Sequence, residues 1–405
     1  MILKRDITLA IEAQREQSAP KDGTIARRFM ERFKPTGTHI EVISGIRRCG
    51  KSTLMKQISH TLYEKAAYFN FEDARVHGFD VSDFPKLDDA FGRGYDAYFF
   101  DEIQNVQSWE VFVRQLHERG EKVYITGSNA TLLSKELGTR LTGRHLRHEL
   151  FPFSYDEFLR YKLPDTNVST FSQFLLNGGF PEFLDTENSE VLQNILKDIV
   201  FRDIAIRYSI RNTASLMDIT LYLLSNIGKE ISYNNLRKTF SLGSANTVSD
   251  YLSWLGDSYL LFFLPRFSWS AKSIAVNPRK VYAVDTGLIN ANTLSFREDR
   301  GRLLENTVYV FLRQFYNSLF YFRNDHECDF VVFENKQCKW VIQVCEVLNQ
   351  DNLNREMEGL HEAMKFFALK EGYVLTLDQK DELDFKGCAI HVVPAYEFFT
   401  NVISL

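Results

Sequence analysis

A glycine-rich run between a strand-like and a helix-like stretch has the residue types that bind phosphate. Residues 45–52 read Gly-Ile-Arg-Arg-Cys-Gly-Lys-Ser and fit the pattern GxxxxGK[ST]. Glycines let successive backbone N–H groups curl around phosphate oxygens, and the N-terminus of the following helix favours the same negative charge. Lys51 would reach the β- and γ-phosphates, and the Ser52 hydroxyl would bind Mg²⁺. The residues expected to bind this nucleotide, ATP with Mg²⁺, are Gly45, Arg48, Cys49, Gly50, Lys51, Ser52 and Thr53.

Two acidic residues follow a second apolar, strand-like run. Asp101 and Glu102 come directly after Ala97–Phe100. Carboxylates at such a strand end serve two roles in ATP hydrolysis. We expect Asp101 to hold Mg²⁺ through water and Glu102 to orient or deprotonate the attacking water.

A third apolar run, Lys122–Thr126, leads to polar residues that could sense the γ-phosphate. Asn129 is the first choice for this role and Ser128 the second. Together with Ala66–Phe71, the strand-like runs alternate with helix-like stretches, which predicts an α/β fold with a doubly wound, mostly parallel sheet. Ligands of such sheets lie beyond the carboxyl ends of the strands, where all these motifs end.

The motifs together resemble those of a known family. The runs GIRRCGKSTL, FFDEIQNVQSWE and ITGSNATLLSKELGTRLTGR, followed by NGGFPE and VYAVDTGL, resemble AAA-type P-loop ATPases of bacteria and archaea that carry a C-terminal DUF4143 domain. The resemblance covers essentially the whole chain. It implies a P-loop ATPase domain with an N-terminal helix at 1–150, a helical lid at 151–212, a winged helix at 213–290 and an α/β domain similar to PD-(D/E)xK nucleases at 291–405.

The resemblance also implies an oligomer in which an arginine completes the site of the adjacent subunit. Such an arginine stabilises transition-state charge and is worth ~10³–10⁵ in rate. Arg144, preceded by Gly143, is the preferred residue, and Arg140 is the second choice. The alternative is a solvated basic loop or a local salt bridge.

The predicted winged helix carries a modest set of cations. The exposed positions of its third helix, expected over Ser244–Tyr259, include no Arg or Lys. The wing offers Lys272, Arg279 and Lys280. Such a set suffices for phosphate contacts but not for reading a sequence. A role in packing against protein is the open alternative.

The C-terminal domain departs from the nuclease pattern at one element. Glu305 on a helix and Asp329 on a strand stand where two metal-binding carboxylates are expected. In the third element, Gln343 replaces a carboxylate and Cys345 replaces the lysine. An amide oxygen can still bind a metal, but a thiol cannot supply the cation. The sequence therefore predicts a nuclease-like domain that does not cut and whose remaining site is Glu305, Asp329 and Gln343.

Composition limits the partners. The chain has 405 residues, a formal net charge of −5 and a pI near 6.0, which argues against coating nucleic acid by bulk charge but leaves a local basic patch possible. Its five cysteines form no CxxC pair, and the longest apolar run is far too short for a membrane span. We expect a cytoplasmic protein with reduced thiols.

Two functions fit these motifs. The first is Mg²⁺-dependent ATP hydrolysis coupled to the remodelling of DNA, including branched DNA, or to translocation on it. The second is a nucleotide-dependent switch that recruits a protein partner in stress or phage defence. An active metal-dependent nuclease ranks last because Cys345 replaces the lysine.

Overall fold

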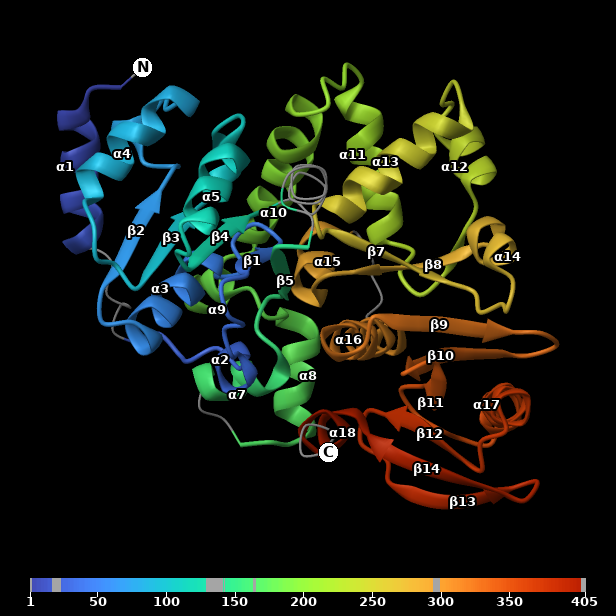
Figure 1. Cartoon of the computed structure of the whole chain (residues 1–405). Helices are drawn as coiled ribbons and strands as arrows, with labels where there is room; N and C mark the ends of the chain where they lie inside the picture. Colours follow the sequence, from blue (N-terminus) through green and yellow to red (C-terminus); the bar gives the residue numbers. More distant parts are fainter. Residues whose placement is uncertain are drawn as a thin grey trace. The chain divides into compact units, whose positions relative to one another are not determined.

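The computed structural model (Figure 1) divides into two compact units. One comprises Met1–Phe151 with Asp257–Tyr259, and the other comprises Pro152–Gly256 with Leu260–Leu405. The residues that the structure describes are 2–16, 23–128, 141, 143–162, 165–293 and 299–401.

The first unit is built on a five-stranded sheet with the order β2-β3-β4-β1-β5, and all its pairings are parallel. Every residue of β1, β3 and β4 is buried, which explains their apolar sequences, because helices cover both faces of a parallel sheet. The strands are β1 (Ile40–Gly45), β2 (Ala66–Asn70), β3 (Ala97–Asp101), β4 (Val123–Gly127) and β5 (His145–Leu150). The helices are α1 (Lys4–Glu16), α2 (Phe29–Arg32), α3 (Lys51–Leu62), α4 (Phe84–Phe91), α5 (Trp109–Glu118) and the 3₁₀ turns η1 (Ala74–Val76), η2 (Val81–Asp83) and η3 (Ile103–Asn105).

The parallel α/β sheet that the motifs predict is confirmed, and the structure adds an edge strand. β5 pairs with β1 along its whole length, from Ile40 opposite His145 to Gly45 opposite Leu150. At the other edge α1 packs against β2 and α4 (Figure 1). Gln14 of α1 fixes this contact, since its amide donates to the Asp73 carboxylate at 2.9 Å and accepts from the Asn70 N–H at 2.8 Å.

The second unit begins with helices and continues through a small sheet. Its three strands have the antiparallel order β6-β8-β7. The helix expected over Ser244–Tyr259 ends at Asp257, and Tyr259 has a φ of 61°, which a helix cannot accommodate. The elements are α7 (Tyr155–Lys162), α8 (Val168–Asn177), α9 (Pro181–Thr186), α10 (Ser189–Asp198), the π-helix η4 (Ile199–Ile206), α11 (Thr213–Leu224), β6 (Glu230–Ile231), α12 (Tyr233–Thr239), α13 (Ala245–Asp257), β7 (Leu261–Pro265), α14 (Ala271–Val276), β8 (Arg279–Ala283) and α15 (Thr286–Asn292).

A six-stranded sheet with the order β13-β14-β12-β11-β10-β9 completes the second unit. Strands β11, β12 and β14 run parallel, whereas β9, β10 and β13 pair antiparallel with their neighbours. Helix α17 packs on this sheet and buries Met357, Leu360 and Met364 against it. The elements are α16 (Arg300–Phe315), β9 (Ser318–Arg323), β10 (Glu327–Glu334), β11 (Gln337–Val344), α17 (Leu353–Phe367), β12 (Glu371–Thr376), β13 (Asp381–Phe385), β14 (Cys388–Pro394) and α18 (Ala395–Asn401).

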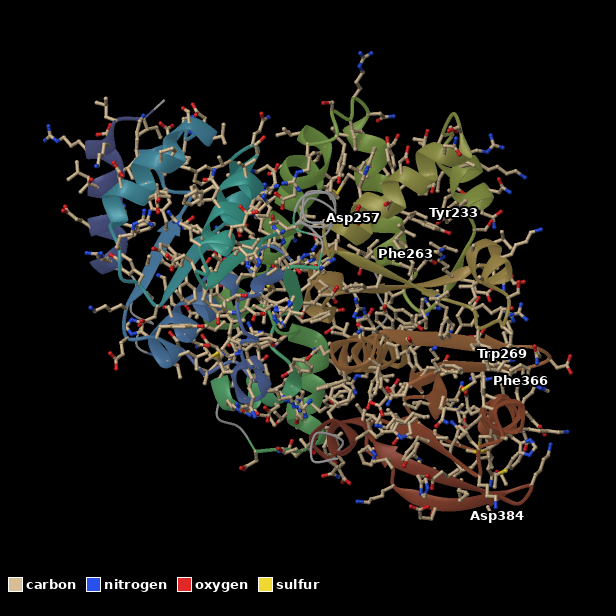
Figure 2. All side chains as sticks on the ribbon, viewed as in Figure 1. Tyr233, Asp257, Phe263, Trp269, Phe366 and Asp384 are labelled. Atoms are coloured by element: carbon tan, nitrogen blue, oxygen red, sulfur yellow. The ribbon has the colours of Figure 1, made fainter. Side chains whose placement is uncertain are left out.

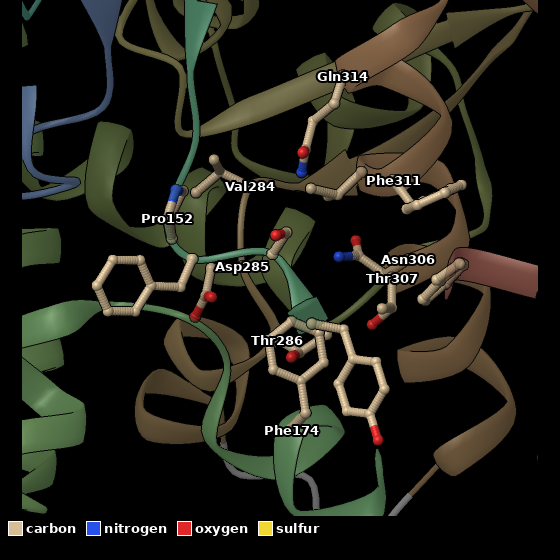
Figure 3. A pocket seen from close by; sticks show the side chains of 14 residues that line it. Pro152, Phe174, Val284, Asp285, Thr286, Asn306, Thr307, Phe311 and Gln314 are labelled. Carbon is tan, nitrogen blue, oxygen red and sulfur yellow. The ribbon is translucent and has the colours of Figure 1, made fainter. Parts of the chain in front are cut away.

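The glycine pair in NGGFPE packs against the aspartate in VYAVDTGL. The Gly179 N–H donates to Asp285 Oδ2 at 2.6 Å, and the Leu288 N–H donates to Oδ1 at 3.0 Å. Gly178 has a φ of 68°, and a Cβ there would lie 2.1 Å from Asp285 Oδ1. Burial raises the pKa of Asp285 to about 6 despite its backbone donors. Figure 3 shows Asp285 beside a cavity of about 40 Å³.

Candidate functional site

The glycine-rich loop connects β1 to α3 and needs glycine at both ends. Gly45 ends β1, and a Cβ there would lie 2.1 Å from the Leu150 carbonyl oxygen of the neighbouring strand. Gly50 precedes α3 with a φ of 101°, a conformation that favours glycine. Arg48 in the loop also has positive φ, 65°, and its side chain is exposed. The loop thus places Lys51 and Ser52 in the first turn of α3.

Lys51 lies inside the loop, close to the acid at the end of β3. Its Nζ donates to the carbonyl oxygens of Gly45 and Ile46, both at 3.2 Å, and lies 3.7 Å from Glu102 Oε1. The side chain is almost completely buried. The structure therefore brings together the lysine and the acid that the sequence singles out from separate motifs.

Hydroxyl groups from two neighbouring strands hold the acids of β3. Thr126 of β4 donates to Asp101 Oδ1 at 2.5 Å and accepts from the Glu102 N–H at 2.8 Å. Tyr68 of β2 donates to Asp101 Oδ2 at 2.6 Å. The sequence interpretation missed both hydroxyl groups, although each belongs to a run that it assigned as a strand. The carboxyl ends of β2, β3 and β4 thus meet around Asp101.

The surroundings of Glu102 shift the pKa of its carboxyl group. Burial raises its pKa above the ordinary value, and the nearby Lys51 ammonium opposes only part of this effect. Glu102 has a φ of 51°, and the Gln104 amide donates to Glu102 Oε2. A buried carboxyl with a raised pKa beside a lysine is a candidate general base.

An arginine before β1 supports the loop from the chain's N-terminal part. Arg27 is buried, and its guanidinium donates to the carbonyl oxygens of Cys49 and Phe151, each at 2.7 Å. The Cys49 side chain is fully buried near Leu150, and burial raises the pKa of its thiol. Cys49 therefore packs the loop, and its side chain faces the protein interior. No sequence motif indicated Arg27, because it lies outside the glycine-rich pattern.

The set of groups fits a nucleotide with Mg²⁺. Lys51 can neutralise phosphate charge, and the Ser52 hydroxyl lies in the first turn of α3. The carboxylates of Asp101 and Glu102 lie at the end of β3, and oxygen ligands of this kind bind Mg²⁺. Two residues expected at this site, Asn129 and Arg140, lie outside the described residues. Ser128, the second choice for the γ-phosphate sensor, is buried directly after β4.

Arg144 lies at the opposite end of the sheet from these groups. Its carbonyl accepts from the N–H of Ile40, the first residue of β1, whereas the loop follows the last residue of that strand. Its guanidinium is 3.4 Å from Glu118 Oε1 and is partly exposed. Arg144 therefore does not belong to the site of its own chain.

In the second unit the structure brings Glu305 and Asp329 together around a lysine from another strand. Lys280 of β8 places its Nζ 3.1 Å from Glu305 Oε1, 2.8 Å from Asp329 Oδ1 and 2.8 Å from Glu327 Oε1. The Tyr282 hydroxyl also donates to Glu305 Oε1 at 2.7 Å. The expectation that Lys280 is available to phosphates is wrong, because its side chain is only 4% exposed.

Gln343 lies next to this acidic cluster, and both ends of its amide form hydrogen bonds within the protein. Its Oε1 accepts from the Asp329 N–H at 3.3 Å, and its Nε2 donates to Glu356 Oε2 at 2.6 Å. Cys345 is buried, which raises the pKa of its thiol to about 12. Among the described residues, no group of three or more His, Cys, Asp and Glu side chains is arranged to hold a metal ion.

Comparison with known families finds two matching domains along the chain. Residues 37–159 match the AAA domain, and residues 168–299 match a domain of unknown function, DUF8612. These matches do not show the DUF4143 domain that the resemblance implies at 291–405. Over the part of the chain that the structure describes, no helix has the length and apolar character of a membrane span.

Three relatives extend the match over most of the chain. The uncharacterized protein MJ1544 of Methanocaldococcus jannaschii is 35% identical over 89% of this chain and 88% of its own length. An uncharacterized protein of Haemophilus influenzae is 29% identical over 84% of this chain and 88% of its own length. A second M. jannaschii protein, MJ1637, is 22% identical over 75% of this chain and 74% of its own length. The chain therefore belongs to the same family as MJ1544, and its AAA domain is of the P-loop type that indicates nucleotide binding and ATPase activity.

Proposed function

We propose that the chain is an Mg²⁺-dependent ATPase that couples ATP hydrolysis to the binding and remodelling of DNA or to translocation on it. The observation that carries the ATPase part is the meeting of Lys51 and Glu102, 3.7 Å apart, beside Asp101 at the carboxyl end of β3. A lysine, a metal-binding acid and a base in one place are the parts that phosphoryl transfer to water requires.

Each group has a separate task in this proposal. Lys51 neutralises phosphate charge, and Ser52 and Asp101 would hold Mg²⁺, which would supply further positive charge to the phosphate oxygens. Glu102 accepts the proton of the attacking water, a role that its raised pKa favours near neutral pH. Thr126 keeps both acids in place through the hydrogen bonds that link β4 to β3.

The DNA part of the proposal depends on the second unit. Three helices, α11 to α13, precede the strands β7 and β8, and this order supports a winged helix at 213–290 between a helical lid at 151–212 and a domain at 291–405. The segment Ser258–Val284 contains no acidic residue but carries Arg266, Lys272, Arg279 and Lys280. Lys272 is exposed and Arg266 and Arg279 are half-buried, a set that favours contacts with phosphate rather than sequence readout.

We also propose that the C-terminal domain at 291–405 is nuclease-like, of the DUF4143 type, and does not cut. Lys280 occupies the space between Glu305 and Asp329 with a permanent positive charge, which opposes binding of a divalent metal there. Gln343 supports this because both ends of its amide bind other groups of the protein.

Oligomer formation in the cytoplasm completes the proposal. Arg144 faces away from the site of its own chain, which supports a role in the site of an adjacent subunit, and Arg140 is the alternative residue. A contact of this kind stabilises the transition state without adding to the affinity for ATP.

The test is the ATPase rate with Mg²⁺, alone and with single-stranded, duplex and four-way-junction DNA, at two salt concentrations. We expect salt-sensitive stimulation by DNA, and loss of nucleotide binding in the Lys51→Ala variant. Turnover that is indifferent to every DNA would refute the coupling and favour a switch that recruits a protein partner. The exposed face of α13 carries Asn246, Ser249 and the acidic Asp250, and the helix has no Arg or Lys, which favours that second candidate.

A further inference from the structure

Two aromatic side chains are exposed on one cluster of rings in the second unit. Phe267, which follows β7, lies at the centre of this cluster. Its ring centroid is 4.9 Å from that of Trp269 and 6.0 Å from that of Phe366. Trp269 is 75% exposed and Phe366 is 44% exposed. Figure 2 shows both side chains on the same side of the unit.

The position of Trp269 is fixed by the packing beneath it. The Phe267 N–H donates to the Tyr321 carbonyl oxygen of β9 at 2.8 Å, and the Phe267 ring stacks on Phe333 with centroids 5.2 Å apart. The indole meets both phenyl rings edge to face. This packing holds a large aromatic ring in solvent, and exposed apolar side chains that gather in one patch mark binding sites.

Two exposed lysines lie close in the sequence to the exposed rings. Lys272 stands on α14, one turn before Val276, which is 74% exposed, and Lys365 precedes Phe366 on α17. Both lysines are exposed. We call the four residues Trp269, Lys272, Val276 and Phe366 the Trp269 surface.

Two acidic side chains near this surface already have partners. Glu362, one turn before Phe366, accepts from the N–H groups of Asp325 and His326 at 3.3 and 2.8 Å. Glu230 pairs with Arg323 at 3.0 Å. The segment that supplies Trp269 and Lys272 contains no acid of its own. The environment of Lys272 therefore favours an anionic partner, although the whole chain is acidic.

We propose that the Trp269 surface binds single-stranded nucleic acid, with bases stacked on Trp269 and Phe366 and phosphates paired with Lys272. Aromatic rings interleaved with cations are the combination that holds a single strand, because every base has a face to stack and every nucleotide has a charge. Bases inside a duplex are already stacked, so the exposed indole gains little from duplex DNA. This inference rests on the DNA part of the proposed function and assigns the form of the nucleic acid.

The test is fluorescence anisotropy with the full chain and a labelled oligothymidylate of about 20 nucleotides, compared with a duplex of equal length. We expect the oligothymidylate to bind more tightly and Trp269→Ala to weaken it about tenfold. Lys272→Ala should reduce the dependence of log affinity on log salt by about 0.7. The matched control is Ile206→Ala, since Ile206 is 73% exposed in the same unit but lies on η4.

The outcomes separate the surface from the wider proposal. Oligothymidylate binding that is unchanged in Trp269→Ala, with the thermal unfolding of the variant also unchanged, would overturn the surface and leave DNA binding intact. Tighter binding of the duplex would overturn the preference for single strands. Binding of polyglutamate that depends on Trp269 would assign the surface to an acidic protein segment instead. Hydrolysis of ATP without binding to any nucleic acid would refute both the surface and the DNA part of the proposed function.

Discussion

Replacing Lys280 by methionine removes the positive charge from the centre of the acidic cluster. The wild-type ammonium lies within 3.1 Å of carboxylate oxygens of Glu305, Glu327 and Asp329. Methionine keeps most of the volume of the side chain but leaves these carboxylates facing one another. Removing one partner of a buried ion pair costs about 3–5 kcal/mol, and we expect the second unit to lose about this much stability.

The size of the loss should depend on pH in a direction that the structure fixes. Burial raises the pKa of Glu305 to about 7 in the wild type, with Lys280 opposing the rise. A group with a raised pKa contributes stability that is present at low pH and is lost as pH rises through that pKa. Without Lys280 the pKa of Glu305 rises further, so the variant should be destabilised more at about pH 8 than at about pH 5.

Urea unfolding followed by tryptophan fluorescence measures this effect unit by unit. A chain with two compact units need not unfold in one step. Trp254 and Trp340 report on the second unit and Trp109 reports on the first, so the two units can be followed separately. Lys272→Met is the matched control, because Lys272 is exposed and its loss should change stability by less than about 0.5 kcal/mol. A loss below about 1 kcal/mol in Lys280→Met, or one independent of pH, would refute the reasoning.

Three further substitutions test the ATPase site, the arginine proposed to act in an adjacent subunit, and the packing of Gly178 against Asp285. Glu102→Gln should lower ATP turnover by ~10²–10⁴ while nucleotide binding persists, and intact turnover would exclude Glu102 as the base. Arg144→Ala should reduce turnover by ~10³ with unchanged ATP affinity, measured with a fluorescent nucleotide, whereas lost affinity would contradict a role in an adjacent subunit. Gly178→Ala should destabilise the second unit by ~3 kcal/mol or more in thermal unfolding, because its φ is 68° and its Cβ would clash with Asp285. Gly243→Ala is its control, since nothing lies within 4 Å of a Cβ there, and an equal effect of both changes would refute the packing argument.

Local patterns in the sequence were enough to predict the parallel sheet and its main acids. The glycine-rich loop, Asp101 and Glu102 each follow an apolar strand, and parallel strands bring their carboxyl ends to one edge. The hydroxyl groups of Tyr68 and Thr126 were missed because their partner is set by strand order. β2 and β4 flank β3 in the sheet, and nothing in either run alone shows that neighbour.

The origin of the cation in the acidic cluster could not be predicted for a similar reason. The nuclease pattern places a lysine on the same strand as the third ligand, and Cys345 stands there instead. The structure supplies Lys280 from β8, which lies 65 residues earlier in the chain than Cys345. A lysine beside Arg279 on a short strand is typical of an exposed wing, and only the tertiary packing buries it. The pairing of Gly179 with Asp285 is likewise a long-range contact that two separate motifs give no means to connect.

The contacts of Arg27 and Gln14 bear on where a working fragment of this protein can be cut. The AAA match begins at residue 37, after both side chains. A fragment cut at that boundary would keep every motif residue but would lose the guanidinium that joins Cys49 to Phe151. It would also expose the Asn70 edge of β2 that Gln14 covers. A fragment made for expression should therefore begin near the start of α1 rather than at residue 37, where the AAA match begins. The same boundary applies to the fusion of a tag.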